Sequence, residues 1–452
     1  MPHNTPKNVT KKVTRREVLG TAALSATAML ATSGLAQTPS RTRPNILFIL
    51  ADDLGYGDLS CYGRPDYRTP VLDAFAAQGM KFMSAYAAAP VCTPTRCAYT
   101  TGRYPQRLPV GLAEPLTDPS KKIGLPPDHP TVASLLKNNG YSTSLVGKWH
   151  LGWEPEYGPN RHGFEEFFGI LSGAADYFTH KSADLDGPDL WEDLKPVERV
   201  GYLTDLFSEK AVQFIERKHT KPFFLSLQYT APHSPWEGPE DAAIGHQHGE
   251  GPMTDGGSLK IYGTMMRSMD AGIGRVLEAL KRSKLERDTL VIFTSDNGGE
   301  RYSFNWPFAF QKMYLWEGGL RVPAMVRWPG VIPVGKTSDQ AAITMDWTAT
   351  ILAATGTAAD PAFPLDGENL LPVCTTARTA YDRTLFFRTR LRDAARMGRW
   401  KYLQDGGAEH LFDLANDPGE KADLRRDNPQ IFATLRNKFT AWNAQMLPKP
   451  KA

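Results

Sequence analysis

The sequence predicts an α/β fold in which helices cover both faces of a β-sheet, followed by a smaller C-terminal α+β module. Two observations lead to this prediction. From residue 45 onward, short apolar runs alternate with amphipathic segments of helical length, which is typical of a sheet buried on both faces. After about residue 372 the pattern changes to short strand-like runs separated by turn residues, which is typical of an antiparallel sheet.

The elements follow from local patterns. Residues 45–50 (NILFIL) are continuously apolar and rich in β-formers, as expected of a buried strand. A helix is expected over 69–79, because Thr69 is a suitable N-cap, Pro70 fits the first turn and Gly79 can end it. The later elements alternate in the same manner: helix 129–140 and strand 142–147, helix 203–218 and strand 222–229, helix 259–283 and strand 289–295.

The C-terminal module is expected to contain short strands at 384–390, 399–404 and 410–414, followed by a helix over 429–446. Two long loops, 153–200 and 234–257, are rich in Gly, Pro and aromatic residues. Loops of this length in a compact domain are usually functional or disordered, and here we expect ordered pocket walls. Five aromatic side chains in loops either stack on sugar rings or belong to the core: Trp153, Tyr177, Trp191, Trp236 and Trp306.

The N-terminus resembles an export signal. Arg15 and Arg16 precede a short, weakly apolar stretch that ends in small residues, so we expect a twin-arginine signal over residues 1–36 and a periplasmic or secreted protein. An uncleaved anchor is the alternative. The predicted domains are this signal, a catalytic domain over 41–371 and a subdomain over 372–452.

Charge and hydropathy exclude several classes of protein. The chain has a net charge of +3, but the first 36 residues hold five of its basic and one of its acidic residues. The remaining 47 basic and 48 acidic residues are balanced, which argues against nucleic-acid binding and membrane-surface binding. Beyond the signal no segment approaches 18 uninterrupted apolar residues, so no stable membrane span is expected.

Cys92 stands out among the four cysteines, Cys61, Cys92, Cys97 and Cys374. Pro94 places it at a helix N-terminus, where backbone N–H groups favour anions and activate nucleophiles. Arg96, one helical turn later, lies on the same face of this helix as Cys92. A Cys92–Cys97 disulfide is disfavoured, because five positions along a helix separate the Cα atoms beyond the roughly 7 Å bridging limit. Cys97 is expected in the core.

Acidic and amide side chains follow two predicted strands. Asp52 and Asp53 come directly after 45–50, and Asp296 and Asn297 come directly after 289–295. In open α/β sheets the ligand site lies beyond the carboxyl ends of the strands, so these residues are expected to converge. Such hard oxygen ligands suit Ca²⁺, or Mg²⁺, better than zinc.

Basic side chains accompany the acids. Lys148 and His150 follow strand 142–147, His233 follows 222–229, and Lys312 lies in a later loop. Positive charges beside a divalent cation are costly unless an anion binds there, which points to a tetrahedral sulfate or phosphate ester. His246 and His248, in a glycine-rich loop, are interpreted as structural.

These motifs together resemble the formylglycine-dependent sulfatases of the alkaline-phosphatase superfamily, especially arylsulfatases and N-acetylgalactosamine-6-sulfatase-like enzymes. The segment CTPTR, starting at Cys92, matches their Cys-x-Pro-x-Arg signature. Further matches follow in the expected order over nearly the whole chain after the signal: ILADDLGYGDLSCYG, TGRYP, GYSTSLVGKWHLG, HGFEEFFG, APHSPW, TSDNGG, LWEGGLRVP and HLFDLANDPGEKADL. Thr95 is a mild departure, since serine is common at this position.

The resemblance implies a mixed sheet, a four-stranded antiparallel C-terminal sheet, and an enzyme that hydrolyses sulfate esters. A maturation enzyme would convert Cys92 to formylglycine, whose hydrate attacks sulfur and then releases sulfate. The implied ligands of one Ca²⁺ are Asp52, Asp53, Asp296, Asn297 and the modified Cys92.

The resemblance also implies roles for the basic residues. Arg96 would steady the hydrate, Lys148 and Lys312 would hold sulfate oxygens, His150 would act as a base, and His233 would assist the leaving oxygen. The expected substrate is a sulfated carbohydrate, with aryl sulfates as artificial substrates. Two alternatives remain: a phosphate or phosphonate ester hydrolase of the same superfamily, and a sulfated-glycan binding protein with unconverted Cys92.

Overall fold

The computed structural model describes residues 43–182, 184–185, 187–242 and 256–450. The predicted export signal and the pair His246 and His248 lie outside these residues. Within them, no helix is both long enough and apolar enough to cross a membrane. All four cysteines are described and carry free thiols, and Cys97 is fully buried in the core as expected.

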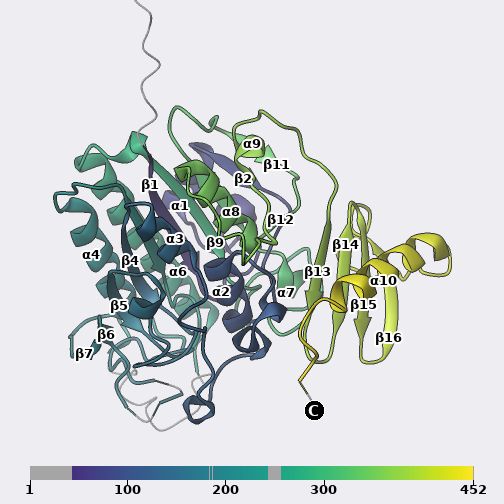
Figure 1. The fold of residues 1–452 in the computed structure, drawn as a ribbon, viewed down its shortest axis with the longest axis horizontal. Helices are drawn as coiled ribbons and strands as arrows, with labels where there is room; N and C mark the ends of the chain where they lie inside the picture. The colour runs from purple at the N-terminus through teal and green to yellow at the C-terminus, as the bar shows by residue number, and fades with distance from the viewer. Residues whose placement is uncertain (1–42, 183, 186, 243–255, 451–452) are drawn as a thin grey trace, which may run out of the picture. The chain divides into compact units, whose positions relative to one another are not determined.

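The main element is a ten-stranded mixed sheet (Figure 1). Its strand order is β11-β2-β10-β9-β1-β8-β4-β5-β6-β7. The bounds are β1 Asn45–Ala51, β2 Met80–Phe82, β4 Ser142–Lys148, β5 Glu166–Ile170, β6 Trp191–Glu192, β7 Lys195–Pro196, β8 Phe223–Gln228, β9 Thr289–Ser295, β10 Ala324–Arg327 and β11 Lys336–Ser338. A separate pair joins β3 (Ala85–Tyr86) and β12 (Ala342–Ile343).

The five central strands, β9 to β5 in that order, are parallel. All seven residues of β1 are buried, and its alternate side chains enter two different cores. Leu47 and Ile49 face one core, whereas Ile46 and Phe48 face the other. The continuous apolar run therefore reflects a strand covered on both faces, which confirms the predicted fold class.

Helices on each face complete these cores (Figure 1). Side chains of α1 (Pro70–Ala77), α4 (Leu203–Glu216) and α6 (Leu259–Arg282) line the first core. Side chains of α2 (Cys92–Thr101), α3 (Val132–Asn138) and α8 (Thr344–Thr355) line the second core. The short helices α7 (Glu317–Leu320) and α9 (Leu371–Cys374) lie in later connections.

Thr69 lies at the N-cap position of α1 and Pro70 in its first turn, as predicted, but the Thr69 side chain does not act as the cap. The Thr69 side chain makes no capping hydrogen bond to the helix, and its hydroxyl accepts instead from the Ser60 backbone N–H at 3.0 Å. The carboxylate of Asp270, on α6, accepts from the N–H groups of Val71 at 3.1 Å and Leu72 at 2.8 Å. The first turn of α1 is therefore capped by a neighbouring helix.

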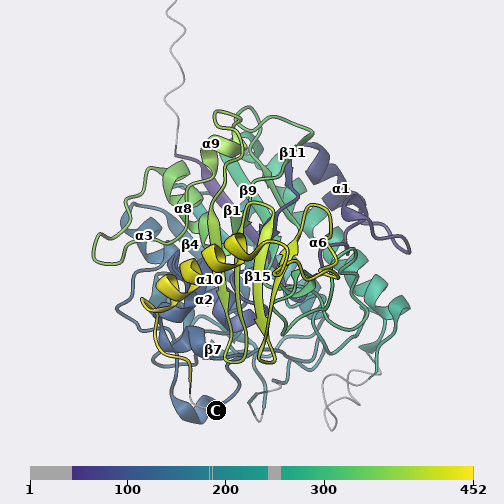
Figure 2. The same cartoon turned by 90° about the vertical axis from the view of Figure 1, so that its right-hand side faces the viewer.

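The C-terminal residues form a four-stranded antiparallel sheet with one helix across it (Figure 2). The bounds are β13 Thr384–Arg388, β14 Asp393–Met397, β15 Trp400–Asp405, β16 Ala408–Asp413 and α10 Pro429–Asn443. Strand β14 was missing from the sequence prediction, because its residues DAARM lack a run of β-formers. The boundary placed between residues 371 and 372 stays a prediction.

Buried contacts join this small sheet to the large one. A third core combines Tyr86, Leu320 and Met345 with Phe387 and Leu403 of the small sheet. Beside this core, the ammonium of Lys401 on β15 lies 3.0 Å from Glu317 of α7 and 2.8 Å from Glu420.

Candidate active site

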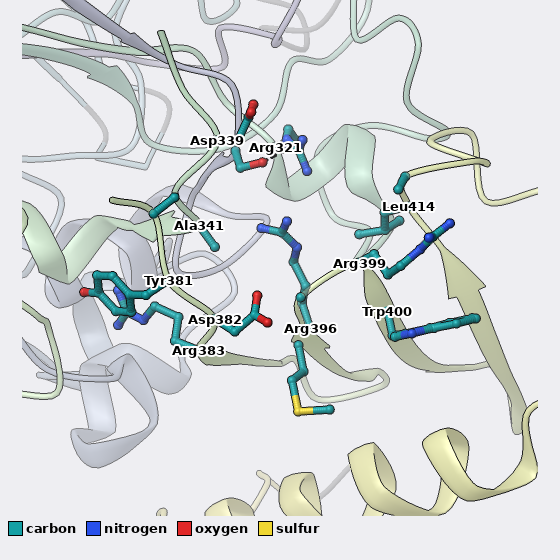
Figure 3. A pocket seen from close by; sticks show the side chains of 15 residues that line it. Arg321, Asp339, Ala341, Tyr381, Asp382, Arg383, Arg396, Arg399, Trp400 and Leu414 are labelled. Atoms are coloured by element: carbon teal, nitrogen blue, oxygen red, sulfur yellow. Dashed lines mark hydrogen bonds between the residues drawn. The ribbon is translucent and has the colours of Figure 1, made fainter. Parts of the chain in front are cut away.

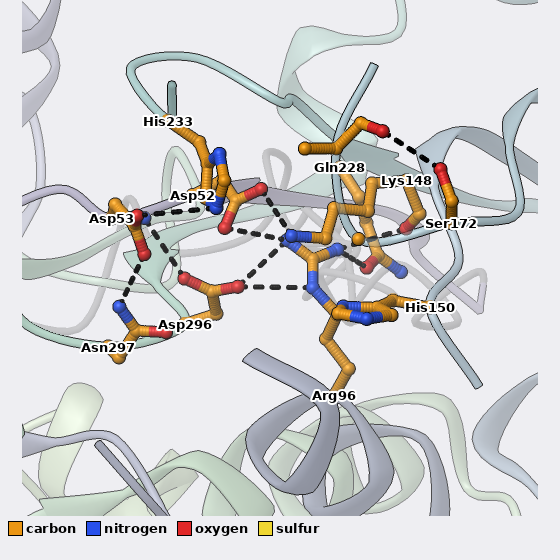
Figure 4. A network of polar contacts seen from close by, with 12 residues as sticks. Asp52, Asp53, Arg96, Lys148, His150, Ser172, Gln228, His233, Asp296 and Asn297 are labelled. Atoms are coloured by element: carbon orange, nitrogen blue, oxygen red, sulfur yellow. Dashed lines mark hydrogen bonds and ion pairs between the residues drawn. The ribbon is translucent and has the colours of Figure 1, made fainter. Parts of the chain in front are cut away.

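The predicted site residues converge at the carboxyl ends of four neighbouring strands, β9, β1, β8 and β4 (Figure 4). Asp52 and Asp296 follow β1 and β9, Lys148 ends β4, and His233 follows β8. The backbone N–H of Asp52 donates to Ala231 at 3.1 Å and that of Asp296 to Ala51 at 3.1 Å. The strand ends are thereby tied together, so the parallel topology itself assembles the site.

Three carboxylates form the centre of the site. The Asp53 N–H donates to Asp296 at 3.2 Å, and this contact holds Asp53 at a positive φ of 61°. The Asn297 amide donates to Asp53 Oδ1 at 2.7 Å. Burial and the neighbouring Asp52 charge raise the pKa of Asp296 to about 7. Burial opposes ionisation of Asp53 as well, but the charges of Lys312, His233 and Lys148 together outweigh it and lower the pKa of Asp53.

This cluster fits a hard divalent cation. Asp52 Oδ1 and Asn297 Oδ1 are buried without a hydrogen-bond partner, which is costly for polar atoms unless something binds them. Possible ligand atoms of Asp52, Cys92 and Asp296 all lie within 4.8 Å of one another, as do those of Asp52, Asp53 and His233. Oxygen donors of this kind suit Ca²⁺ or Mg²⁺.

Cys92 is the first residue of α2 and is almost fully buried. Burial raises the pKa of its thiol, although Lys148 and Lys312 act in the opposite direction. A raised pKa makes the unmodified thiol a poor nucleophile at neutral pH, because the thiolate is the reactive form.

Arg96, one turn along α2, is also buried and connects three strands. Its guanidinium donates to Asp296 Oδ2 at 2.9 and 3.1 Å, to the Lys148 carbonyl at 2.9 Å and to Gln228 Oε1 at 2.8 Å. Sequence reasoning missed Gln228, which looks like the polar end of β8. Its partner is 132 residues away in the chain, so no local pattern could have indicated it.

The two lysines pair with the carboxylates. Lys148, fully buried, donates to Asp52 Oδ2 at 2.6 Å. Lys312 donates to Asp53 Oδ2 at 2.7 Å and lies 3.1 Å from His233 Nε2. Burial favours the neutral form of Lys312, but the neighbouring negative groups, Asp53 first among them, together more than offset it and raise the pKa of Lys312. Lys312, which the sequence placed only in a later loop, thus lies among the other predicted site residues.

Both histidines are held in the neutral form. Burial and then Lys148 lower the pKa of His150 well below its usual range, and burial and then Lys312 lower that of His233 to about 3. His150 Nε2 faces the Leu116 carbonyl at 2.8 Å, so it carries the proton. His150 Nδ1 is buried without a hydrogen-bond partner and is available as a proton acceptor.

Comparison with known proteins gives the family. The Sulfatase family model matches residues 44–357. The chain belongs to the sulfatase family. A second model, N-sulphoglucosamine sulphohydrolase, C-terminal, matches residues 305–445 of the sulfatase chain. The prediction made from the motifs is thereby confirmed, and the protein is a sulfuric ester hydrolase.

Individual relatives support the same assignment. The sulfatase is 34% identical to N-acetylgalactosamine-6-sulfatase of Sus scrofa, over 90% of this chain and 87% of that protein. It is 33% identical to steryl-sulfatase of Mus musculus, over 78% of this chain and 68% of that protein. The solved structure of Ps i-CgsB in complex with k-i-k-neocarrahexaose has a TM-score of 0.81 and 32% identity, and covers 91% of this chain and 94% of that one.

The fold is shared more widely. The structure of phosphonate monoester hydrolase of Agrobacterium radiobacter has a TM-score of 0.65 at 20% identity, over 89% of this chain and 96% of that one. At this identity the likeness concerns the fold alone. The alkaline-phosphatase-like architecture expected from the motifs is therefore confirmed.

The aromatic loop residues of this sulfatase divide between the core and the surface. Trp153, Tyr177 and Trp236 are buried, and Trp191 is half-buried. The Tyr177 hydroxyl donates to the His233 carbonyl at 3.0 Å, so this residue contacts the backbone of a site residue and is not itself open to substrate. Only Trp306 of the five is open to solvent, with 67% of its surface exposed, which leaves it as the candidate for stacking on a sugar.

Proposed function

We propose that this sulfatase hydrolyses sulfate esters of a carbohydrate, after conversion of Cys92 to formylglycine and with Ca²⁺ as the divalent cation. The observation that carries the proposal is the position of Cys92. It lies at the N-terminus of α2, within 4.8 Å of carboxylate oxygens of Asp52 and Asp296. The sulfated-carbohydrate class is supported by relatives that are N-acetylgalactosamine-6-sulfatases and by the similar structure that holds k-i-k-neocarrahexaose.

Each side chain of the proposed site has a distinct task. The cation would be held by Asp52, Asp53, Asp296 and Asn297. The guanidinium of Arg96 forms an ion pair with the Asp296 carboxylate. Cys92, once converted, would supply the nucleophilic oxygen as its formylglycine hydrate, and a cation held by these four ligands would supply the Lewis acidity that activates this oxygen. Lys148 and Lys312 supply the positive charge that binds sulfate oxygens and stabilises their charge as the ester bond breaks.

The histidines would accept or position protons. His150 Nδ1 can accept a proton, because its Nε2 is engaged by the Leu116 carbonyl. His233 Nδ1 lies 2.6 Å from the Ser234 carbonyl and its Nε2 lies 3.1 Å from Lys312 Nζ. The ammonium of Lys312, which His233 Nε2 orients and whose raised pKa keeps it charged, can therefore donate a hydrogen bond toward the leaving oxygen.

A substrate panel tests the proposal. Protein made with a formylglycine-generating enzyme is assayed on a sulfated galactosamine, on sulfated galactan oligosaccharides, on an aryl sulfate and on an aryl phosphonate. Release of sulfate from a saccharide is expected, together with slower action on the phosphonate. Absence of sulfate release from both saccharides and the aryl sulfate, in protein of confirmed conversion, would overturn the proposal.

We further propose twin-arginine export of the chain to the periplasm or the medium. The support is the pair Arg15 and Arg16 ahead of a short apolar stretch. A chain with both arginines changed to lysine is expected to stay in the cytoplasm of a bacterial host that exports the unchanged chain. Equal export of both chains would refute it.

A further inference from the structure

A cavity of about 900 Å³ is lined by residues of the C-terminal sheet and of the large domain (Figure 3). Its wall combines Arg321, Asp339 and Arg383 with the β14–β15 hairpin, which contributes Arg396 and Trp400. None of its lining residues belongs to the proposed catalytic cluster. The volume is in the range of sites for small molecules and saccharide units.

Arg396 is the unusual side chain of this cavity. Only 9% of it is exposed, and its Nε and Nη1 atoms are buried without a hydrogen-bond partner. The guanidinium rests over the Tyr86 ring, 4.9 Å from its centroid, and Figure 3 shows it pointing into the cavity. Enclosure of two of its nitrogens costs this guanidinium solvation that the Tyr86 ring and the charge of Glu317 replace only in part.

Among Arg396 and the largely buried side chains around it, cations outnumber carboxylates by one. Arg396, Arg321 and Lys401 face two buried carboxylates, Glu317 and Glu420, and both carboxylates already pair with Lys401. Arg399 and Arg383 of the cavity wall have their own carboxylate partners, which are Asp413 and Asp346.

Two more carboxylates, Asp339 and Asp382, line the same cavity but are exposed. Among the described residues, neither forms an ion pair with Arg396. Because they are solvated, they compensate the buried charge only weakly. They are placed to accept hydrogen bonds from hydroxyl groups, and the half-buried Trp400 offers an apolar face of the kind on which sugars stack.

We propose that this cavity is a second, non-catalytic site for a sulfate oxyanion, with Arg396 as its anchor. The sulfate group comes either from a sulfated saccharide chain or from free sulfate, and the saccharide source rests on the proposed function. Sulfate oxygens accept charge-assisted hydrogen bonds from guanidinium groups. The Nη2 amino group of Arg396, the one nitrogen of this guanidinium that is not enclosed, is the donor placed to bind such an oxygen in the cavity.

Equilibrium dialysis with radiolabelled sulfate, on the full matured chain, tests the site. The unchanged protein is expected to hold one sulfate more than Arg396→Met, while both hydrolyse an aryl sulfate at the same rate and are inhibited equally by sulfate. Arg396→Lys is expected to retain part of the binding. Arg399→Met is the matched control, because Arg399 is exposed and already paired, and it should bind like the unchanged protein.

A second measurement identifies the source of the sulfate group. If a saccharide chain fills the cavity, Arg396→Met raises KM for a sulfated oligosaccharide several-fold without changing kcat. If free sulfate fills it, KM is unchanged and only the dialysis result differs. Equal sulfate binding by the unchanged protein and Arg396→Met would overturn the proposal, whether or not hydrolysis of sulfate esters is found.

Discussion

Three positive charges pair with three carboxylates in the candidate active site. The cations are Arg96, Lys148 and Lys312, and the carboxylates are those of Asp52, Asp53 and Asp296. Each contact is 3.1 Å or shorter, and nearly all of these side chains are buried. Buried ion pairs seldom add much net stability, because desolvation offsets their attraction. The arrangement is better explained by chemistry that needs a cation and an anion at the same place.

The first prediction concerns removal of the cation. Exhaustive chelation of the matured enzyme is expected to abolish nearly all turnover of an aryl sulfate, because the carboxylates then pair with the lysines that should bind sulfate. Added Ca²⁺ should restore the rate, and Asn297→Ala should require a higher Ca²⁺ concentration for the same recovery. Undiminished turnover in protein shown by elemental analysis to be metal-free would contradict this prediction.

A second prediction concerns Asp189, which lies outside the catalytic cluster and fixes the segment after β5. Its carboxylate accepts from the N–H groups of Leu171 and Ser172 and from the Trp191 ring. Burial raises its pKa to about 6 from 3.8, against the effect of these hydrogen bonds. The folded state therefore holds this proton more tightly than the unfolded state, so stability falls as pH rises from about 4 to 6.

The measurement compares thermal unfolding of the unchanged protein and Asp189→Asn across this pH range. The asparagine keeps one acceptor oxygen and does not titrate, so the fall in melting temperature between pH 4 and 6 should be shallower in the variant. Above pH 6 the difference in melting temperature between the two proteins should be constant. Parallel curves from pH 4 to 7 would show that Asp189 does not titrate as inferred.

At the scale of elements, the parallel strands could be predicted because their signal is local. Continuous apolar runs such as β1 and β9 need no distant partner to be recognised. The Asp270 cap and strand β14 could not be predicted in this way. Asp270 is 199 residues from Val71, and the β14 residues DAARM are held in a strand by pairing with β13 and β15 on either side. Tertiary contacts there override local propensity.

The third prediction tests the cap supplied by α6. Asp270→Ala should lower the free energy of unfolding by about 1–3 kcal/mol, because two N–H groups of α1 lose their acceptor. Asp270→Asn should cost less, since it keeps one oxygen. Urea unfolding of both variants checks this order. If Asp270→Ala unfolds like the unchanged protein, the helix obtains its cap elsewhere.

At the scale of the molecule, the C-terminal sheet is joined to the large sheet by a buried charged contact as well as by an apolar core. Lys401 is fully buried between Glu317 and Glu420. Glu317 also accepts from the Tyr86 hydroxyl at 2.6 Å and pairs with Arg321 at 2.9 Å. The two sheets therefore share a buried network, in which Lys401 and Glu420 of the C-terminal part contact Glu317 of the large part.

The fourth prediction follows from this network. Lys401→Met should lower the free energy of unfolding by about 3–5 kcal/mol, because it leaves two carboxylates buried without their common cation. Arg399→Met, on the same hairpin, is the control, since Arg399 is exposed to solvent and its removal should change the free energy of unfolding far less. Similar losses in both variants, measured by urea unfolding, would mean that the buried network does not hold the sheets together.

Most site residues could be predicted from the sequence, but the groups that hold their side chains in place could not. Asp52, Asp53, Asp296 and Asn297 were recognisable because each directly follows an apolar strand, and parallel strands bring such positions together. Gln228 and the Leu116 carbonyl were not, because their roles arise only when Arg96 and His150 reach them across the fold. For Tyr177 the sequence left both a sugar-stacking role and a place in the core open, and its burial shows that it belongs to the core, where its hydroxyl contacts the His233 carbonyl.

The central claim is that the nucleophile arises from Cys92 by conversion to formylglycine. The most direct measurement is the mass of the tryptic peptide Phe82–Arg96, taken from preparations with different extents of conversion and paired with their turnover of an aryl sulfate. Turnover is expected to rise in proportion to the fraction of peptide in which CH₂–SH is replaced by CHO, and Cys92→Ala should be inactive yet folded. Full turnover from protein whose Cys92 is still a thiol would contradict the account.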